Sequence, residues 1–235
     1  MAASETRNAR VLAGGDTWAI DLNDHSHGFT SGDTLNETNE PASSRRWVQR
    51  LLTEYSRTVS VPVVFYGDAT DALSPRTSGY SFVVLGELGG VQAWLGGEAT
   101  WISVPTVAPQ SGIVSGGVEF MQRSSWSSGN IAVPFNFTAG NTSVNISRAF
   151  SNTSTAYLVV TSKTVTGNRV ITLSDGSASI AESFATVGVR SVDLSTLANN
   201  VASGSLTVAS LTGDQAITGY LLIGTQYTIP SGVLS

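Results

Sequence analysis

The feature that most constrains the fold of this chain is a series of short apolar segments, cut at near-regular intervals by turn-forming residues, between Ile131 and Ile229. In the first segment Ile131, Val133, Phe135 and Phe137 alternate with other residues, so one face of an extended strand would be apolar. Comparable segments follow at Val144–Phe150, Tyr157–Thr161, Arg169–Leu173, Ser177–Ala181, Val187–Leu194, Leu206–Leu211 and Ile217–Ile223. Residues that tolerate or require positive φ lie between them, at Gly167-Asn168, Asp175-Gly176, Asn199-Asn200 and Gly204. Short strands at this spacing predict a mainly β chain built of antiparallel β-sandwich or jelly-roll modules.

The amino-acid composition argues against several classes of function. The chain has 235 residues, of which 12% are charged, and a net charge of −5 with one lysine, Lys163. No basic stripe is present to follow phosphates, which argues against a nucleic-acid partner. The absence of cysteine excludes disulfides and thiolate chemistry. Because Met1–Arg10 is polar and no apolar run reaches membrane-spanning length, we expect synthesis in a cytoplasm and no membrane insertion.

The sequence divides into four expected parts. Residues 1–42 are polar, contain seven of the 17 acidic residues and are expected to form an N-terminal attachment arm, in which Val11–Ala13 and Trp18–Leu22 could join a sheet. Residues 43–58 are expected to be a helix, residues 59–117 a small β domain, and residues 118–235 the C-terminal β-sandwich. The boundary at 117 follows a segment rich in Pro, Gly and Ser.

The expected helix has an N-cap at Ser43 or Ser44 and covers Arg45–Thr58. Its apolar residues fall on one stripe, because they are spaced i, i+1, i+4, i+5 and i+8: Trp47, Val48, Leu51, Leu52 and Tyr55. A lone helix of this length is marginal in water, so the stripe needs a partner surface. That surface is either the chain's own β domain or a symmetry mate in an oligomer.

Strands are also expected at Val59–Tyr66, Tyr80–Leu85, Gly90–Trp94 and Thr100–Val104, with Gly96-Gly97 as a hairpin turn between Trp94 and Trp101. This segment, Val91–Val104, resembles a short hairpin element of phage tail and fibre proteins in which two aromatic residues flank a Gly turn. The tryptophans pack either in a core or interface, or present ring faces to sugars. The candidates for a glycan-binding platform are Trp94, Trp101, Trp126 and Tyr220.

His25 and His27 are the only histidines, and in an extended backbone residues i and i+2 face the same side. Two imidazoles are too few for a closed metal site in one chain, but three copies around a threefold axis supply enough nitrogens for an octahedral divalent ion. The alternative is that both are loop residues satisfied by Asp21, Asp24 or water. The His-x-His motif resembles that of trimeric bacteriophage tail fibres and tail needles. That resemblance implies a homotrimer with one iron or zinc ion per trimer; otherwise no cofactor is expected.

Catalytic motifs are not evident. The sequence lacks a Gly-x-Ser-x-Gly elbow, a phosphate-binding Gly-x4-Gly-Lys and a His–Glu metalloprotease pattern. A pair of carboxylates that cleaves a glycoside is still possible at Asp68 with Asp71 and at Glu87 with Glu98. Such a pair is defined by the distance between the carboxylates in the folded protein and not by their spacing in the sequence. We therefore expect no enzymatic activity.

These features together favour a structural protein of a bacteriophage virion, assembled in the host cytoplasm and bound to other virion proteins. Within that class, we expect a trimeric tail fibre or adhesin that displays β modules for binding a host-surface glycan. A capsid decoration protein or head fibre is the first alternative. A free carbohydrate-binding module that acts as a monomer is an alternative from another class.

Overall fold

The computed structural model describes residues 10–13, 16–20, 30–40, 49–66, 79–84, 92–103, 113–123, 126–138, 142–164, 166–210 and 216–226. Within these ranges the chain forms antiparallel strands and no helix, so the expected mainly β fold is confirmed. The described part accordingly holds no helix that could cross a membrane. The strands are β1 (Arg10–Ala13), β2 (Asp16–Ile20), β3 (Thr30–Glu40), β4 (Gln49–Tyr66), β5 (Gly79–Val84), β6 (Trp94–Ser103), β7 (Ile113–Gln122), β8 (Ser127–Phe137), β9 (Ser143–Asn145), β10 (Thr155–Lys163), β11 (Arg169–Ser174), β12 (Ser179–Phe184), β13 (Gly188–Val192), β14 (Thr207–Ser210) and β15 (Ile217–Gln226).

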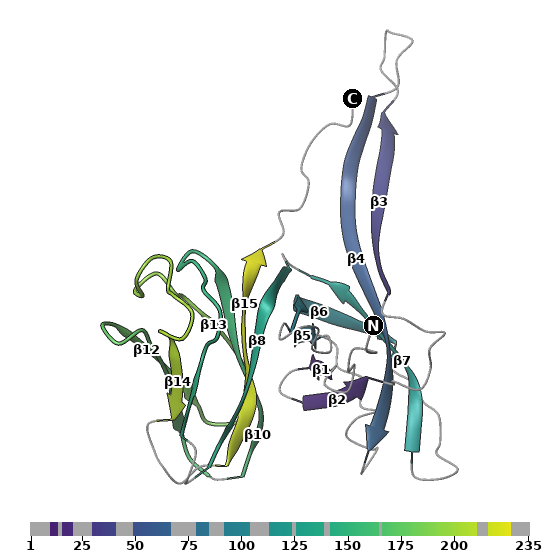
Figure 1. The fold of residues 1–235 in the computed structure, drawn as a ribbon. Helices are drawn as coiled ribbons and strands as arrows, with labels where there is room; N and C mark the ends of the chain where they lie inside the picture. Colours follow the sequence, from purple (N-terminus) through teal and green to yellow (C-terminus); the bar gives the residue numbers. More distant parts are fainter. Residues whose placement is uncertain are drawn as a thin grey trace, which may run out of the picture. The chain divides into compact units, whose positions relative to one another are not determined.

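The chain divides into two compact units, each assembled from separated segments (Figure 1). Unit 1 combines Met1–Ala19, Tyr80–Gly97 and Trp126–Gln226, and unit 2 combines Ile20–Gly79, Glu98–Ser125 and Tyr227–Ser235. This grouping runs across the expected boundaries at residues 42, 58 and 117. The first 19 residues belong to the same unit as the C-terminal strands because β1 pairs with β5 and buries Val11 and Leu12.

Unit 1 contains two antiparallel sheets that share a core. One sheet includes the strand order β13-β10-β15-β8, and the other has the order β12-β11-β14-β9. Their buried side chains form a single apolar cluster, to which β8 contributes Ile131, Phe135 and Phe137 and β11 contributes Ile171 and Leu173. The alternation predicted for Ile131–Phe137 is therefore confirmed, because these residues face the second sheet.

The opposite face of the β10-β15-β8 sheet is also covered. A second apolar cluster joins Tyr157 and Val159 of β10 and Leu222 of β15 to Leu12, Phe82, Val84 and Trp94. Neighbouring residues along β10 therefore enter different cores, with Leu158 in the first and Tyr157 in the second. Burial on both faces explains the uninterrupted apolar runs in these strands. Full burial stabilises the fold by about 1.5–3 kcal/mol per large apolar side chain, which makes this sheet the rigid centre of unit 1.

The turns between these strands contain residues with positive φ at the predicted positions. Gly167, Gly176 and Gly204 have φ values of 83°, 90° and 78°, and Asn200 has 56°. Glycine adopts this region without a Cβ penalty, and asparagine tolerates it.

Unit 2 is an antiparallel sheet of β3, β4, β7 and the Glu98–Ser103 part of β6. Strands β3 and β4 form a long hairpin whose register runs from Thr30 opposite Ser60 to Glu40 opposite Gln49, with an irregularity after Asn36. Strand β4 continues along β7, from Thr58 opposite Met121 to Tyr66 opposite Ile113.

The helix expected over residues 45–58 is wrong for the described part of that segment, because Gln49–Thr58 belongs to β4. Its residues pair with β3, for example Leu35 with Tyr55. A short helix gains only local hydrogen bonds and is marginal alone, whereas this part of β4 gains hydrogen bonds to a neighbouring strand, β3. The spacing of Leu51, Leu52 and Tyr55, which marks one stripe on a helix, does not mark one face of a strand.

The hairpin turn expected at Gly96-Gly97 is also wrong, because β6 continues through both glycines. Gly96 pairs with Ser127 of β8 inside the ladder. A Cβ at Gly96 would collide with the carbonyl oxygen of Ser81 and lie 2.7 Å from the Cα of Phe82. The glycine therefore permits a close approach between strands rather than a reversal of the chain.

A candidate ligand-binding groove along strand β8

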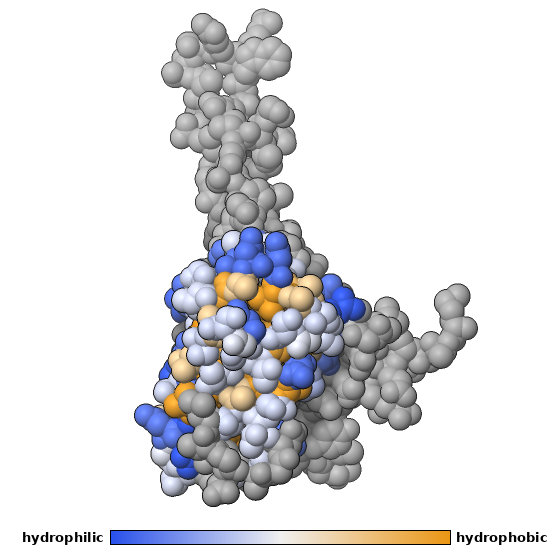
Figure 2. All heavy atoms as spheres, turned by 60° about the vertical axis from the view of Figure 1, so that its left-hand side comes forward, coloured by the Kyte–Doolittle hydropathy of each residue, from blue (hydrophilic) through white to orange (hydrophobic). Residues whose placement is uncertain are grey.

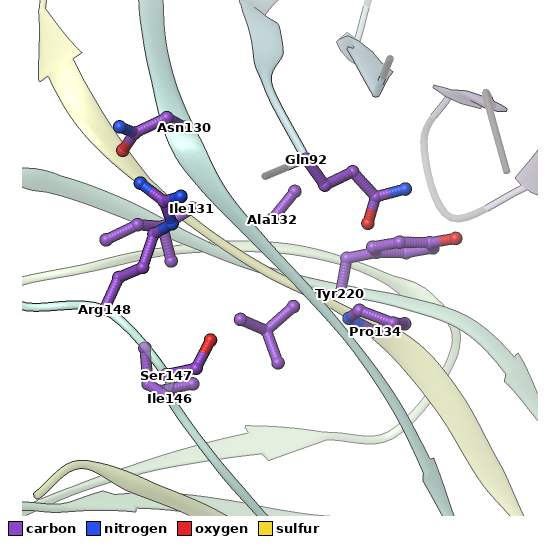
Figure 3. Close-up of a pocket in the computed structure, with 10 residues that line it drawn as sticks. Gln92, Asn130, Ile131, Ala132, Pro134, Ile146, Ser147, Arg148 and Tyr220 are labelled. Atoms are coloured by element: carbon purple, nitrogen blue, oxygen red, sulfur yellow. The ribbon is translucent and has the colours of Figure 1, made fainter. Parts of the chain in front are cut away.

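A pocket of about 320 Å³ lies in unit 1 beside β8, beyond the point where the β8–β6 ladder ends at Gly129. Its lining comes from β8, from residues 146–148, from Gln92 and from β15 (Figure 3). The apolar lining residues are Ile131, Ala132, Val133, Pro134 and Ile146, and the polar ones are Gln92, Asn130, Ser147, Arg148 and Tyr220.

A second hollow of about 400 Å³ adjoins the first, because both are lined by Asn130 and Ile131. Its remaining lining residues are Ser128, Gly129, Ala149, Phe150, Ser154, Ile223, Gly224 and Thr225. The two hollows together, lined by β8 from Ser128 to Pro134 and by residues 146–150, are called the β8 groove below.

The wall formed by residues 146–150 is fixed by the segment 201–206. The Ile146 N–H donates to the Leu206 carbonyl at 2.9 Å, and the Ile146 carbonyl accepts from the Gly204 N–H at 2.6 Å. The Ser147 carbonyl accepts a hydrogen bond from the Ser203 hydroxyl. At the other end the Phe150 N–H donates to the Val201 carbonyl at 3.1 Å, and Phe150 and Ile146 are both buried. Arg148 therefore projects from a backbone segment held at both ends.

The opposite side of the groove carries an aromatic ring. Tyr220 of β15 stands directly across the ladder from Pro134 of β8, so the two side chains share one face of the sheet. Figure 3 shows the Tyr220 ring beside Pro134, with Gln92 near it, while Arg148 extends past Ile131 toward Asn130 on the other side of β8. Tyr220 is half-buried in the second core and lines the pocket.

The electrostatic character of the groove comes from one residue. Among the described residues that line the two hollows, Arg148 is the one with a charged side chain, and none is acidic. The other polar groups are amides and hydroxyls, which both donate and accept hydrogen bonds. The groove thus offers a cation, neutral donors and acceptors, one aromatic ring and an apolar floor, which is the usual make-up of a small-molecule site.

The other aromatic candidates for glycan binding lie elsewhere. Trp94 and Trp126 are 2% and 0% exposed, so their ring faces are packed inside unit 1. Trp101 belongs to β6, where the structure describes its backbone. Tyr220 is the candidate that the structure brings to a hollow with polar neighbours, and glycan binding there stays a prediction.

The remaining predicted site residues are not tested by the structure. His25, His27, Trp47 and Val48 lie outside the described residues, as do Asp68, Asp71 and Glu87. Leu51, Leu52 and Tyr55 lie in β4, and their role at an oligomer interface stays a prediction. Within the described ranges no three His, Asp or Glu side chains gather where a metal could bind.

Sequence reasoning missed Gln92, Asn130 and Arg148, which come from distant segments and belong to no motif. The sequence contains only weak signals for these residues. Pro134 interrupts an apolar strand, which is typical of a sheet edge, and Arg148 is a single cation within the apolar segment Val144–Phe150.

No protein-family model and no curated protein matches this sequence. Among solved structures, the chain is similar to the Dit protein (gp 19.1) of SPP1, described as a paradigm of the hub adsorption apparatus in phages that infect Gram-positive bacteria. The similarity covers 94% of this chain and 99% of that one, at 9% sequence identity and a TM-score of 0.31. This likeness to a phage adsorption-apparatus protein is weak, and the function proposed below rests on other observations.

Proposed function

We propose that this chain is a non-enzymatic structural component of a bacteriophage virion and that unit 1 binds a host-surface glycan in the β8 groove. The observation that carries the binding proposal is the position of Tyr220, which lies in the groove with Gln92, Asn130 and Arg148. Aromatic faces pack against the C–H side of a sugar ring, and amide and guanidinium groups pair with its hydroxyls. The groove supports this chemistry because its walls are held by β-ladders and the 146–150 hydrogen bonds.

The virion part of the proposal is supported by sequence features. The His25-Ser-His27 motif and the Trp94–Trp101 segment resemble elements of phage tail and fibre proteins, and the chain has no cysteine. The surface fits a protein that is displayed outward. Figure 2 shows a face on which pale, weakly polar residues predominate between scattered apolar and strongly polar ones. Among the described large hydrophobic side chains, only Val187 is exposed, at 38%.

We also propose where the protein lies in the particle and how many copies assemble. The protein is a homotrimer that attaches through its N-terminal segment and serves as a tail fibre or adhesin. Sedimentation equilibrium of the purified full chain tests the trimer, and a monomer mass contradicts it in solution. Binding to host envelope glycans supports an adhesin, whereas binding to empty capsids without glycan affinity supports a capsid decoration protein.

Calorimetry with host cell-wall oligosaccharides tests the groove. Tyr220→Ala should abolish binding, whereas Tyr220→Phe, which keeps the ring, should retain most of it. Val187→Ala, at an exposed position outside the lining residues of the groove, serves as the matched control and should bind like the wild type. Equal glycan affinity in the wild type and Tyr220→Ala would contradict the assignment, and shortened oligosaccharide products after incubation would contradict the non-enzymatic role.

One alternative function is favoured by the same groove. A free carbohydrate-binding module would use Tyr220 in the same way but act as a monomer. A monomer with glycan affinity and no affinity for virion components would support that alternative over the virion role.

A further inference from the structure

We propose that the β8 groove selects an anionic unit of its saccharide, a carboxylate or a phosphate, and that Arg148 is the residue that recognises it. This inference rests on the proposed glycan binding and specifies the class of sugar.

Three other cationic side chains that the structure describes in unit 1 have partners within the chain. The Lys163 Nζ donates to the Ala185 carbonyl at 2.7 Å, and an Nη of Arg169 donates to the Asn168 carbonyl at 3.2 Å. An Nη of Arg190 donates to the Val189 carbonyl at 3.2 Å, and its guanidinium lies 5.5 Å from the ring centroid of Phe184. For Arg148, by contrast, no hydrogen bond or ion pair joins its guanidinium to another residue in the described part of the chain.

The surroundings of Arg148 also favour an anion. The side chain is half-buried, and its backbone is held by the hydrogen bonds of Ile146, Ser147 and Phe150. Neither hollow of the groove is lined by a described acidic residue that could neutralise the guanidinium. A partly desolvated cation attracts an anion more strongly than a fully exposed cation, because solvent screens it less.

The geometry of the guanidinium donors fits an acidic group. A guanidinium presents a planar fork that matches two oxygens of a carboxylate or phosphate. Figure 3 shows the guanidinium of Arg148 extending toward Asn130, whereas Ser147 lies near the base of the Arg148 side chain and also lines the pocket. These neutral groups suit the hydroxyls that accompany an acidic group on a sugar ring.

The rest of the groove limits the number of charges in the ligand. The adjoining hollow is lined by Ser128, Ser154 and Thr225 together with apolar and glycine residues, and no described charged residue lines it. The groove as a whole therefore matches a saccharide chain with one anionic unit next to a neutral one, rather than a dense polyanion. A single ion pair also predicts that affinity falls only modestly with added salt.

The test compares matched charged and neutral probes. Cellobiouronic acid, which joins one uronate to one neutral glucose, has the same sugar skeleton as its methyl ester, but only the acid carries a carboxylate; glycerol 3-phosphate and glycerol form the corresponding pair with and without a phosphate. We expect the full-length wild type to bind one charged probe at least tenfold more tightly than its neutral partner. The pair that shows the preference distinguishes a uronate from a phosphate.

Arg148→Met should remove this preference, because it weakens binding of the charged probe far more than binding of the neutral one. Arg190→Met, whose guanidinium already has a carbonyl and a ring as partners, is the matched control and should keep the preference. Arg148→Lys keeps the charge but not the fork, so it should retain only part of the preference. It also provides a second comparison if Arg148→Met fails to fold.

The outcomes separate the two proposals. Equal affinity for charged and neutral probes, or a preference that survives in Arg148→Met, would overturn the role of Arg148 and leave neutral glycan binding intact. Failure of both the charged and the neutral probes, together with failure of host cell-wall oligosaccharides, would overturn the proposed glycan binding itself.

Discussion

The indole Nε1 of Trp94 donates a hydrogen bond of 3.1 Å to the carbonyl oxygen of Ile223, 129 positions away in the sequence. The contact lies where the β15–β8 register shifts after Ile223, and it passes close to Gly129, where an added Cβ would lie 2.9 Å from Nε1. Trp94 also packs edge-on against Phe82 and Tyr157, each at a ring-centroid distance of 5.9 Å. One side chain thus joins β6 to the central strands by both packing and a buried hydrogen bond.

Trp94→Phe should destabilise the protein by about 1–3 kcal/mol, because an aromatic but smaller side chain remains while the buried carbonyl of Ile223 loses a donor. Trp94→Ala should cost about 3–5 kcal/mol, since a cavity is added. Denaturant unfolding followed by circular dichroism measures both. A Trp94→Phe variant as stable as the wild type would show that the hydrogen bond makes no net contribution to the free energy of unfolding.

Gly219→Ala should destabilise the protein by about 1–3 kcal/mol through overpacking. An added Cβ would collide with the carbonyl oxygen of Val159 and lie 2.7 Å from Cζ of Phe135, whose ring stacks on that of Phe137 with centroids 4.9 Å apart. Gly79→Ala is the matched control, because nothing lies within 4 Å of its added Cβ. It should be neutral or slightly stabilising, and equal losses in the two variants would contradict the packing argument.

Ser81→Ala should change stability by less than about 1 kcal/mol, or increase it. The Ser81 side chain is fully buried, and its hydroxyl has no hydrogen-bond partner among the described residues. Removing an unpaired buried hydroxyl removes a desolvation cost rather than an interaction. A thermal melt suffices as the measurement, and a loss well beyond 1 kcal/mol would reveal a partner for this hydroxyl.

Asp175 makes the stability of unit 1 dependent on acid pH. Its Oδ2 accepts from the Ala198 N–H at 2.8 Å, and its Oδ1 accepts from the N–H groups of Ser177 at 2.8 Å and Ala178 at 2.7 Å. These hydrogen bonds, led by that from Ala198, lower the pKa of Asp175 below its ordinary value of 3.8. A lowered folded-state pKa means that the contribution is complete above the unfolded-state pKa and is lost as pH falls through the folded-state pKa.

Asp175→Asn should therefore be less stable than the wild type at neutral pH, and the difference should shrink as pH falls below 3.8. Urea unfolding at a series of pH values from about 6 to about 2 measures this convergence. Ser177→Ala, which keeps the backbone donor, should retain the pH dependence of the wild type. A constant difference between wild type and Asp175→Asn at every pH would refute the linkage.

The double variant His25→Ala/His27→Ala tests the proposed metal site of the trimer. If three His-x-His motifs hold one ion, iron or zinc should be present at one per three chains in the wild type and absent from the variant. Elemental analysis of chelator-washed protein gives the stoichiometry, and unit 1 should unfold at the same denaturant concentration in both proteins. The same metal content in wild type and variant would end the proposal.

Much of unit 1 could be predicted from the sequence, because its strands are marked by local patterns of residues. Apolar alternation and positive-φ turn residues locate β8, β10, β11, β12, β13, β14 and β15 to within a few residues. Both properties are local, since side-chain alternation follows from the pleat and positive φ from the lack of a Cβ.

The errors occurred where a distant partner decided the local structure. Residues 49–58 have helical spacing, yet they are a strand because β3 pairs with them, and Gly96 looks like a turn residue, yet it lies inside a ladder with Ser127. Pairing across the chain outweighs a local propensity that spans less than about 1 kcal/mol per residue.

The sequence by itself determined the chemistry of the chain: β strands with turns at defined places, no thiol, few charges, and aromatic residues able to pack or to bind. Only the tertiary structure decided which of those residues are packed in a core and which line a groove. It buried Trp94 and Trp126 and brought Tyr220, Arg148 and Gln92 together at β8. Those three residues are far apart in the sequence, and their proximity depends on strand order and register, which are set by the packing of the whole core rather than by any local run of residues.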